Sequence, residues 1–466
     1  MSIYLRKEWF GGIIGVPQTY DVYLLNKKAY QEITAYYLDK ISISSTLYRE
    51  LENKGIQITS NYKIFDNANS QNNCILSAPL ILWLEITNEC NSNCIHCFRN
   101  TGNFGESLSI TNITNLINEA SELGIFKITI TGGEPLLHDD FNLIAHMINR
   151  TGMDFRVFTG SEIDKDRLKN TNFQLIDHLF VSLDGDRTHN NWMRGDRAFD
   201  SACRLLNHVR EKWEHLKITI SLTIDNNNWR RFDEIIMIAK RYRIKSILTR
   251  PLFITNRNTS LYPHMFATKF NLLNALNTIV RAANSADIEV QINKIPYFPM
   301  EKRIFYDDSE SAASIWNILG IETNMDCVGG NLVMGIKHNG AVLPCGFIDQ
   351  NTYPFRPFNV AEHTIKSIWN FDQNINWMRN IKPSFDCKNC NYLAKCNGGC
   401  RANSLNFGFE LSDTDQYCLY SNTCLGRHFP PSESKYKNNY FDIESEQPII
   451  SKTKLSTKCG WSTYDT

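Results

Sequence analysis

The 466-residue sequence predicts an α/β protein built around a partial (β/α)6 TIM-type barrel. Three observations support this fold class. Strand and helix patterns alternate from about residue 78 to 310, a small α+β pattern precedes them over residues 1–75, and a cysteine-rich region follows over residues 311–428. Such alternation is typical of parallel sheets with right-handed crossovers. A chain of this length is expected to hold roughly two to four domains.

Residues 1–75 are expected to form a winged-helix-like α+β domain. Three short strand patterns, IYLRKE, FGGIIG and YDVYLL, come first. Asn26 is then a suitable N-cap for the helix pattern KKAYQEITAYYLD. A second helix pattern, STLYRELENKG, places Leu47 and Leu51 one turn apart and ends at Gly55. The polar stretch DNANSQNN that follows is expected to be a linker.

Six strand patterns define the barrel domain, residues 78–310: LILWLEI, FKITIT, DFRVFT, HLFVSL, KITISLTI and KSILTR. Amphipathic helix patterns such as FDSACRLLNHVREKW lie between them. Six strand–helix units are fewer than the eight of a closed barrel, so we expect a partial one. Functional sites lie at the carboxyl ends of such strands. Both ECNSNCIHC and GGEP directly follow a strand pattern, which makes them candidates for a site.

The last two regions have weaker patterns. Residues 311–428, the cysteine-rich domain, contain the short strand patterns LVMGI and AVLPC. They have few apolar residues for a core of their own, so metal is expected to help them fold. Residues 429–466 are polar and without periodicity, and we expect this tail to be disordered.

Composition excludes two classes of partner. Lysine plus arginine and aspartate plus glutamate both number 49, so no net charge favours nucleic acid or an anionic membrane. The first residues, MSIYLRKEWFGG, lack the apolar core of a signal peptide. The longest apolar stretch, APLILWLEI, is far shorter than the ~20 residues of a membrane span. We therefore predict a cytoplasmic protein with no nucleic-acid or membrane partner.

Fourteen cysteines in a cytoplasmic protein indicate metal binding rather than disulfides. Ten of them occur at tight spacings: Cys90, Cys94, Cys97, Cys327, Cys345, Cys387, Cys390, Cys396, Cys400 and Cys418. Clustered thiolates in a reducing compartment hold zinc or iron–sulfur clusters. The choice between these two metals decides the function.

The segment ECNSNCIHCFRN supplies three thiolates, from Cys90, Cys94 and Cys97, and no fourth. Three cysteines on one loop can hold three irons of a cubane cluster and leave the fourth iron open to an external ligand. A zinc knuckle completed by His96 or a lone cysteine is one alternative, and a chance loop is another. Structural zinc sites usually pair one C-x2-C with a second, and the barrel region has no second pair.

CNSNCIHC after a first strand and TGGEP after a second together resemble the radical S-adenosylmethionine (radical SAM) enzymes. The resemblance implies that Cys90, Cys94 and Cys97 hold a [4Fe–4S] cluster. The open iron of that cluster would bind the amino and carboxylate groups of S-adenosyl-L-methionine. Reductive cleavage of this cofactor would then yield a 5′-deoxyadenosyl radical, which abstracts hydrogen from a substrate.

The same resemblance assigns cofactor contacts outside the cysteine loop. Gly132 and Gly133 are expected to let the backbone approach the cofactor closely, because glycine has no Cβ. Glu134 is expected to accept hydrogen bonds from the cofactor's ammonium group. In FVSLDGDRTHNNWMRGDRAF, Ser182 and Arg194 are expected to bind its carboxylate. The alternatives are an ordinary turn, a capping serine and a surface arginine.

The second cysteine set matches the SPASM extension of radical SAM enzymes in its spacings, which implies two auxiliary iron–sulfur clusters. The outer cluster would be held by Cys387, Cys390, Cys396 and Cys418. The inner cluster would be held by Cys327, Cys345 and Cys400. A fourth inner ligand would come from Asp326 or Cys424, unless one iron stays open to a substrate thiolate. Two structural zinc sites are the alternative.

The first stretch, LRKEWFGGIIGVPQTYDVYLLNKKAYQEI, is similar to the PqqD-like recognition domains that precede many peptide-modifying radical SAM enzymes. Such a domain binds a leader peptide as an added strand beside its sheet. The alternative is an N-terminal cap that stabilises the barrel.

Together these resemblances imply a maturase of ribosomally made peptides (RiPPs). Its partners would be a precursor peptide, bound through its leader, and a low-potential ferredoxin or flavodoxin as electron donor. Formation of a thioether (sactionine-type) cross-link is the leading expectation. Carbon–carbon or carbon–oxygen cross-linking, a sulfatase-type or tetrapyrrole substrate, and a non-enzymatic zinc scaffold remain alternatives.

Overall fold

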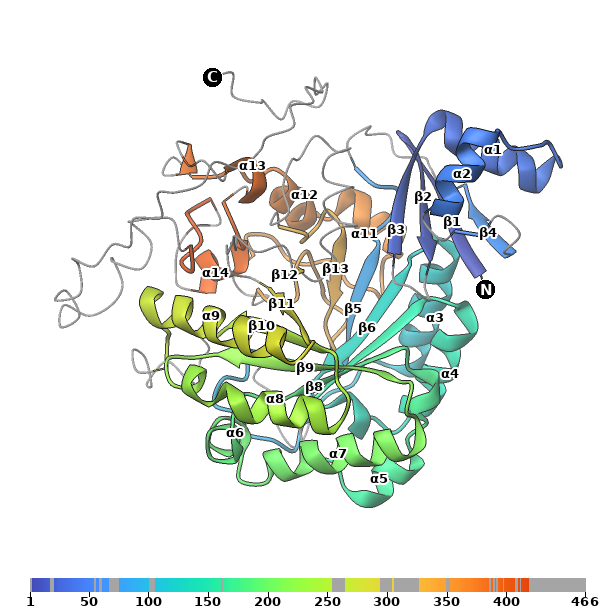
Figure 1. Ribbon diagram of the computed structural model, residues 1–466. Coiled ribbons are helices and arrows are strands. Elements are labelled where there is room, and N and C mark those ends of the chain that lie inside the picture. The colour runs from blue at the N-terminus through green and yellow to red at the C-terminus, as the bar shows by residue number, and fades with distance from the viewer. Residues whose placement is uncertain are drawn as a thin grey trace.

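The structure is a computed structural model, and Figure 1 shows the arrangement of its elements. It describes residues 2–16, 21–53, 56–57, 61–66, 75–99, 105–160, 162–253, 265–293, 304–305, 327–348, 353–384, 387–388, 390, 393–396, 398–406, 410 and 412–418. Gly55, Asp326, Cys424, most of the expected linker and the C-terminal tail lie outside these residues, so the predictions made for them stay predictions.

The six predicted barrel strands are all present and parallel to their neighbours in chain order, which confirms the partial barrel. They are β5 (Ile81–Thr87), β6 (Lys127–Gly132), β7 (Asp154–Thr159), β8 (His178–Ser182), β9 (Lys217–Ile224) and β10 (Ser246–Pro251). Because their apolar side chains are buried on both faces, these strands read as nearly continuous hydrophobic runs.

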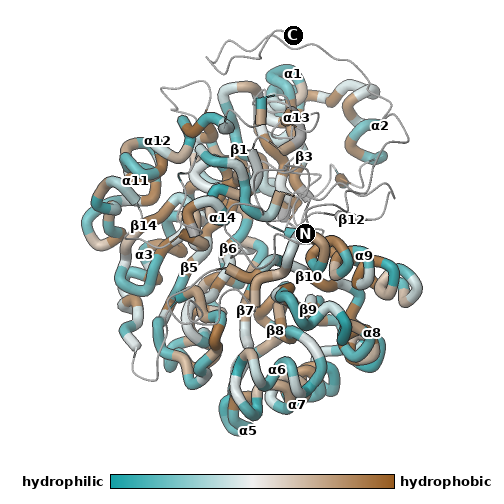
Figure 2. Tube along the Cα trace, turned by 90° about the vertical axis from the view of Figure 1, so that its left-hand side faces the viewer, coloured by the Kyte–Doolittle hydropathy of each residue, from teal (hydrophilic) through white to brown (hydrophobic). Residues whose placement is uncertain are grey.

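Helices connect these strands and cover the outside of the sheet (Figure 1). They are α3 (Ile110–Glu122), α4 (Phe141–Thr151), α5 (Lys165–Asn170), α6 (Arg187–Arg194), α7 (Ala198–Lys212), α8 (Phe232–Arg241) and α9 (Lys269–Ser285), with short 3-10 turns at Pro135–Leu137, Phe173–Leu175 and Asn228–Arg231. Figure 2 shows hydrophilic residues along the outward sides of α5 and α7 and hydrophobic ones along β8. In the described part of the chain, no helix combines the length and apolar character that crossing a membrane would require.

The sheet continues beyond the barrel strands at both ends, giving ten strands among the described residues. At one end β11 (Glu289–Ile292) and β12 (Ile304–Phe305) follow β10. At the other end β13 (Val333–Ile336) pairs in parallel with β5, and β14 (Val342–Leu343) pairs antiparallel with β13. The cysteine-rich segment thus contributes strands to the same sheet as the barrel.

The cysteine-rich segment also shares the barrel's hydrophobic core. Trp369 on α11 (Ile365–Phe371) is fully buried there, and its indole nitrogen donates to the carbonyl of Leu76 at 2.8 Å. Ile375 on α12 (Gln373–Arg379) joins the same cluster. The expectation of a segment with few apolar residues for a core is therefore wrong for this part: some of its apolar residues join the barrel core, and others, such as Leu343, Ile348 and Tyr353, form a second cluster. Two short helices, α13 (Leu393–Cys396) and α14 (Arg401–Asn406), complete the segment.

The N-terminal unit contains the three predicted strands, the two predicted helices and a fourth strand. Its sheet has the order β3-β2-β1-β4 and is built from β1 (Ser2–Glu8), β2 (Gly11–Val16), β3 (Asp21–Asn26) and β4 (Asn61–Phe65). Asn26 caps α1 (Lys27–Leu38) as predicted, its side chain accepting from the Ala29 amide at 2.8 Å. Leu47 and Leu51 of α2 (Ser45–Asn53) are buried in the unit's own core. The strand β4, parallel to β1, was not predicted.

This unit packs firmly on the barrel, beside α3 (Figure 1). Tyr4 belongs to the main core, its ring lies tilted 6.0 Å from that of Phe126, and its hydroxyl donates to the carbonyl of Thr151 at 2.5 Å. Arg6 is fully buried and donates to the carbonyls of the barrel segments that flank it. Side chains of β1 therefore join the N-terminal unit to the barrel.

Candidate active site at the mouth of the barrel

One cavity opens at the carboxyl ends of the barrel strands, where sequence analysis placed the site. Its empty volume is ≈ 940 Å³, its solvent-open part included, which is at the upper end of the usual range for small-molecule sites. Side chains from the ends of β5 through β10 and from the cysteine loop line it. The residues predicted from the sequence meet here: Cys90, Cys94, Cys97, Gly132, Gly133, Glu134, Ser182 and Arg194.

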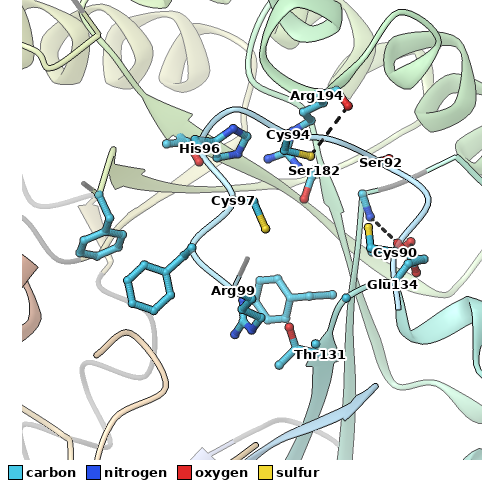
Figure 3. A pocket seen from close by; sticks show the side chains of 18 of the residues that line it. Cys90, Ser92, Cys94, His96, Cys97, Arg99, Thr131, Glu134, Ser182 and Arg194 are labelled. Carbon is cyan, nitrogen blue, oxygen red and sulfur yellow. Dashed lines mark hydrogen bonds between the residues drawn. The ribbon is translucent and has the colours of Figure 1, made fainter. Parts of the chain in front are cut away.

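The three cysteine side chains of the loop after β5 turn toward the same space (Figure 3). A turn in which the Cys97 amide donates to the Cys94 carbonyl at 3.2 Å brings two of them together. The Ile95 amide donates to the Met193 carbonyl at 3.0 Å, which ties the loop to the end of α6. Burial raises the pKa of Cys94 to about 11, although the Arg194 charge opposes this. The thiol therefore needs a bound cation before it loses its proton.

Gly132 and Gly133 allow a backbone–backbone contact that was not predicted from the sequence. The Gly133 amide donates to the Thr87 carbonyl, and the Glu134 amide to the Glu89 carbonyl, both at 2.8 Å. A Cβ added at Gly133 would lie 1.9 Å from the Glu89 carbonyl oxygen, and one at Gly132 would lie 2.3 Å from that of Thr87. The glycines thus let the GGEP segment pack directly against the backbone at the start of the cysteine loop.

Replacing Gly133 by alanine is expected to displace that backbone and, with it, Cys90. We expect the rate of SAM cleavage to fall at least about tenfold and the iron content after anaerobic reconstitution to fall by up to about four per chain, because a 1.9 Å contact with backbone cannot be relieved by a rotamer change. Gly346→Ala is the matched control, since a Cβ there meets no atom within 4 Å. Equal losses in the two variants would contradict this role of Gly133.

Glu134 is held rigidly at the edge of the cavity. Its side chain is almost fully buried and accepts from the Thr159 hydroxyl at 2.9 Å, the Gly160 amide at 3.0 Å and the Leu136 amide at 3.1 Å. Three donors fix the direction of the carboxylate. A carboxylate preorganised in this way is able to hold an ammonium group without further reorganisation.

Arg194 is oriented by a carboxylate that sequence analysis did not single out. Its Nε donates to Asp184 Oδ2 at 2.6 Å, and the Thr223 amide donates to the other oxygen of Asp184 at 2.8 Å. Burial alone would raise the pKa of Asp184, but the charges of Arg194 and His96 and the hydrogen bonds from Arg194 and Thr223 together outweigh it and lower the pKa to about 2. Arg194 Nη1 lies beside Ser182, because a Cβ added at Gly160 would meet both. The signal that could have found Asp184 is its place just beyond a strand end, in SLDG.

Two further groups of residues at the cavity were missed. Arg99, two residues after Cys97, donates to Glu85 at 2.7 Å, and Lys337 lies 3.0 Å from the same carboxylate. This buried cluster joins β5, the cysteine loop and the turn between β13 and β14. His96, to which no catalytic role was assigned, is buried with its Nε2 3.7 Å from Asp184, and burial lowers its pKa to about 3. The second group that sequence analysis did not identify consists of Arg250 and the aromatic residues that line the same cavity.

Several auxiliary cysteines lie near one another. Burial raises the pKa of Cys396, and the negative charges of Asp415, Cys418, Cys387 and Cys390 add to this rise, so these groups lie within reach of one another's field. Burial raises the pKa of Tyr353, and the negative charges of Cys345 and Cys327 add to this rise, so both cysteines lie near Tyr353. In the described part of the chain, no three His, Cys, Asp or Glu side chains are gathered tightly enough to hold a single metal ion.

Cys400 is placed by the buried carboxylate of Asp415. Its amide donates to Asp415 Oδ2 at 2.7 Å, and the Asn403 side chain donates to Oδ1 at 2.8 Å. Burial raises the pKa of Asp415 to about 7. The Tyr417 hydroxyl, one residue before Cys418, donates to the carbonyl of Leu252 and so ties this region to the end of β10.

Residues 84–239 match the radical SAM superfamily, and this match spans the cysteine loop, GGEP, Ser182 and Arg194. The chain is a radical SAM enzyme. Residues 327–391 match the SPASM iron–sulfur cluster-binding domain. The radical SAM enzyme therefore uses S-adenosylmethionine and a [4Fe–4S] cluster, together with auxiliary iron–sulfur clusters. Thiols that share an open cavity with a preorganised carboxylate and an arginine fit this pair of cofactors.

Several relatives of the radical SAM enzyme have names that state their reactions. It is 26% identical to the Fe-coproporphyrin III synthase of Methanosarcina barkeri, over 69% of this chain and 83% of the relative. It is also 26% identical to the mycofactocin maturase MftC of Mycobacterium tuberculosis, over 76% of this chain and 88% of the relative.

Solved structures share the fold. Streptococcus suis SuiB bound to its precursor peptide SuiA superposes with a TM-score of 0.67 at 17% identity, covering 91% of this chain and 98% of SuiB. anSMEcpe with bound AdoMet and the Cp18Cys peptide gives a TM-score of 0.55 at 16% identity, covering 73% of this chain and 94% of the other.

Proposed function

We propose that this radical SAM enzyme oxidatively modifies a ribosomally made precursor peptide. The observation that carries the proposal is the meeting of the cysteine loop, Glu134, Ser182 and Arg194 around one cavity that also adjoins the SPASM segment. The SuiB structure contains its precursor peptide SuiA, and MftC is named as a maturase, which supports the choice of a peptide substrate.

Within this proposal each predicted residue has one task. Cys90, Cys94 and Cys97 would hold the [4Fe–4S] cluster, which with bound S-adenosylmethionine supplies the 5′-deoxyadenosyl radical for hydrogen abstraction. Glu134 would hold the ammonium group of the methionine moiety, because its carboxylate is already fixed by three donors. Ser182 and Arg194 would hold the carboxylate, with Asp184 keeping the guanidinium in place.

The SPASM cysteines would hold the two auxiliary clusters. The outer set is Cys387, Cys390, Cys396 and Cys418, and the inner set is Cys327, Cys345 and Cys400. The inner set has three described thiols, and Asp326 or Cys424 would provide a fourth ligand unless a substrate thiol does so. A place for a substrate thiol favours thioether formation as the reaction, with carbon–carbon or carbon–oxygen cross-linking as the alternative outcomes.

The N-terminal unit would bind the leader of the precursor as a PqqD-like domain. Its sheet has β3 and β4 as its outer strands, and an extended peptide binds by adding to a sheet edge. SuiB covers more of this chain than anSMEcpe does, 91% against 73%, in agreement with a counterpart of this unit in SuiB. Its close packing on the barrel also fits the alternative of a stabilising cap, so the two roles need separate tests.

The test is anaerobic turnover of a precursor peptide encoded beside the gene. Reconstituted enzyme, S-adenosylmethionine and a low-potential ferredoxin or flavodoxin are expected to yield 5′-deoxyadenosine and a peptide that has lost a pair of hydrogen atoms per cross-link. Mass spectrometry locates the change. Protein that reconstitutes with zinc, or turnover of an iron-coproporphyrin instead of the peptide, would overturn the proposal. The second result is worth measuring because of the coproporphyrin synthase among the relatives.

Leader recognition is tested separately by hydrogen–deuterium exchange. Adding the precursor is expected to slow amide exchange in β3 (Asp21–Asn26) or β4 (Asn61–Phe65), because an added strand forms hydrogen bonds along the edge it joins. The strand β11 (Glu289–Ile292), far along the other sheet, serves as the internal control. Unchanged exchange in both outer strands would contradict leader binding and support the alternative that the N-terminal unit is a stabilising cap.

A further inference from the structure

Three arginines line the cavity, and one differs from the other two. Arg99 is paired with Glu85 at 2.7 Å, and Arg194 with Asp184 at 2.6 Å. Arg250, in β10, has no hydrogen bond or ion pair to any residue in the described part of the chain. Its guanidinium lies 6.0 Å from the ring centroid of Phe347, a distance at which a cation–π attraction is weak.

Among the described residues, no carboxylate forms a direct ion pair with Arg250. Burial lowers its pKa to about 10 and the positive field of Arg194 acts in the same direction, while the negative charge of Asp184 opposes them. The group is still charged at neutral pH, since its pKa stays well above 7. A partly buried cation without a counter-ion is costly, and an anion that enters the cavity would remove that cost.

Four aromatic residues line the same cavity and form what we call the aromatic wall: Trp83, Phe98, Phe253 and Phe347. Phe347 joins the other three, with ring centroids 5.4 Å from Phe253, 5.5 Å from Trp83 and 6.3 Å from Phe98. The wall belongs to the cluster that includes Cys345, so it connects the barrel mouth to the SPASM segment. An apolar surface with a single cation is suited to a ligand that is largely apolar and carries one negative group.

Arg250 comes from a different strand than the residues proposed to hold the cofactor. Glu134 follows β6 and Ser182 ends β8, whereas Arg250 is in β10, two strands farther along the sheet. Arg194, with its Nε on Asp184 and Nη1 beside Ser182, already provides a guanidinium for the cofactor carboxylate. A second anion site in the same cavity is therefore available to the substrate.

We propose that Arg250 and the aromatic wall form a substrate subsite that binds a carboxylate of the modified peptide segment, from an acidic side chain or a C-terminus. A guanidinium offers parallel donors that match the oxygens of a carboxylate, and the rings cover the neighbouring side chain. The subsite rests on the proposed function in that its ligand is taken to be a peptide. It adds a requirement for an acidic group near the position of hydrogen abstraction.

The test compares two capped dipeptides that differ only in charge, N-acetyl-Phe-Asp-amide and N-acetyl-Phe-Asn-amide. Both are titrated calorimetrically into the anaerobic holoenzyme in the presence of S-adenosylmethionine. We expect the aspartyl probe to bind at least about tenfold more tightly, since a hydrogen bond to a charged group is a strong one. Arg250→Gln should remove this preference and Arg250→Lys should keep part of it. Arg187→Gln, which changes an exposed arginine paired with Asp200, should leave it unaltered.

Equal binding of the two probes, or binding of neither, would overturn the subsite. So would a loss of S-adenosylmethionine affinity in Arg250→Gln as large as that in Arg194→Gln, because Arg250 would then serve the cofactor. The proposed function fails differently. If the holoenzyme prefers the aspartyl probe through Arg250 but modifies no peptide, the proposed peptide maturase is wrong and the subsite stands. If Arg250→Gln turns over an acidic precursor normally, only the subsite is wrong.

Discussion

Replacing Cys97 by alanine is expected to lower 5′-deoxyadenosine formation by about a thousandfold, equivalent to ~4 kcal/mol of barrier. The side chain points into the cavity with those of Cys90 and Cys94, and no other cysteine lines that cavity among the described residues. A cubane cluster held by two thiolates instead of three should be lost on reconstitution, lowering the iron content by about four per chain. Iron analysis and chromatography of the reaction products measure both effects.

Cys203→Ala is the matched control for this variant. Cys203 lies on α7, packs against the main core and is outside the cavity. Its replacement should leave the iron content and the product yield unchanged. Persistent 5′-deoxyadenosine formation by Cys97→Ala, with iron undiminished, would show that the cluster is held elsewhere. Zinc instead of iron in both proteins would support the alternative in which the cysteine loop binds zinc.

The sequence was informative where the chemistry depends on near neighbours along the chain. Each barrel strand is an apolar run bounded by polar residues, and each precedes a helix, so the parallel sheet followed from local pattern alone. Cys90, Cys94 and Cys97 lie within one loop, and their spacing fixed their convergence. The Asn26 cap was equally local, since a cap bonds to an amide three residues away.

Residues whose partners are distant in the chain were harder to predict. Arg194 was found by resemblance, but its orientation depends on Asp184, which in turn is held by the Thr223 amide from another strand. Arg250 reads in the sequence as one of many arginines. Its isolation appears only once the other two arginines of the cavity have been seen to have carboxylate partners. Such pairings arise from folding and leave no periodic signal.

The joining of the segments was also beyond the sequence. β13 pairs with β5 across more than two hundred residues, and alternation shows which face a strand buries but not its neighbour. The same holds for β4, which lies at the edge of the N-terminal sheet and has only intermediate burial. GGEP was predicted to contact the cofactor because of its glycines, and that stays a prediction; the sequence did not indicate that the packing of two adjacent loops also requires these glycines.

Arg6→Met is expected to open the N-terminal unit by removing a fully buried charge. Arg6 Nε donates to Glu8 at 2.8 Å, and the two Nη atoms donate to the carbonyls of Ala78, Pro79 and Gly124. Without Arg6 the buried Glu8 carboxylate has no cation, and breaking such a pair costs ~3–5 kcal/mol. Native-state hydrogen exchange of the β1 amides measures this local free energy of opening without requiring the whole chain to unfold in one step.

Lys7→Met, one residue away, is the matched control. Lys7 pairs with Asp66 at 2.8 Å, but both side chains are largely exposed, so its loss should cost at most about 1 kcal/mol. Burial already raises the pKa of Glu8, and without Arg6 that pKa should rise further. A raised pKa in the folded state means that the defect of Arg6→Met is full at neutral pH and shrinks as the pH falls and Glu8 becomes protonated.

The double variant Arg6→Met/Glu8→Met separates charge from packing. An apolar pair in place of a buried ion pair is often neutral, so the double variant should recover most of the stability that Arg6→Met loses. If Arg6→Met costs no more than Lys7→Met, the charge is not buried as the structure has it. Because Arg6 joins the unit to the barrel, Arg6→Met should also lose turnover of the precursor peptide while cofactor cleavage at the distant barrel mouth continues. Loss of both activities together would instead assign the unit a purely stabilising role.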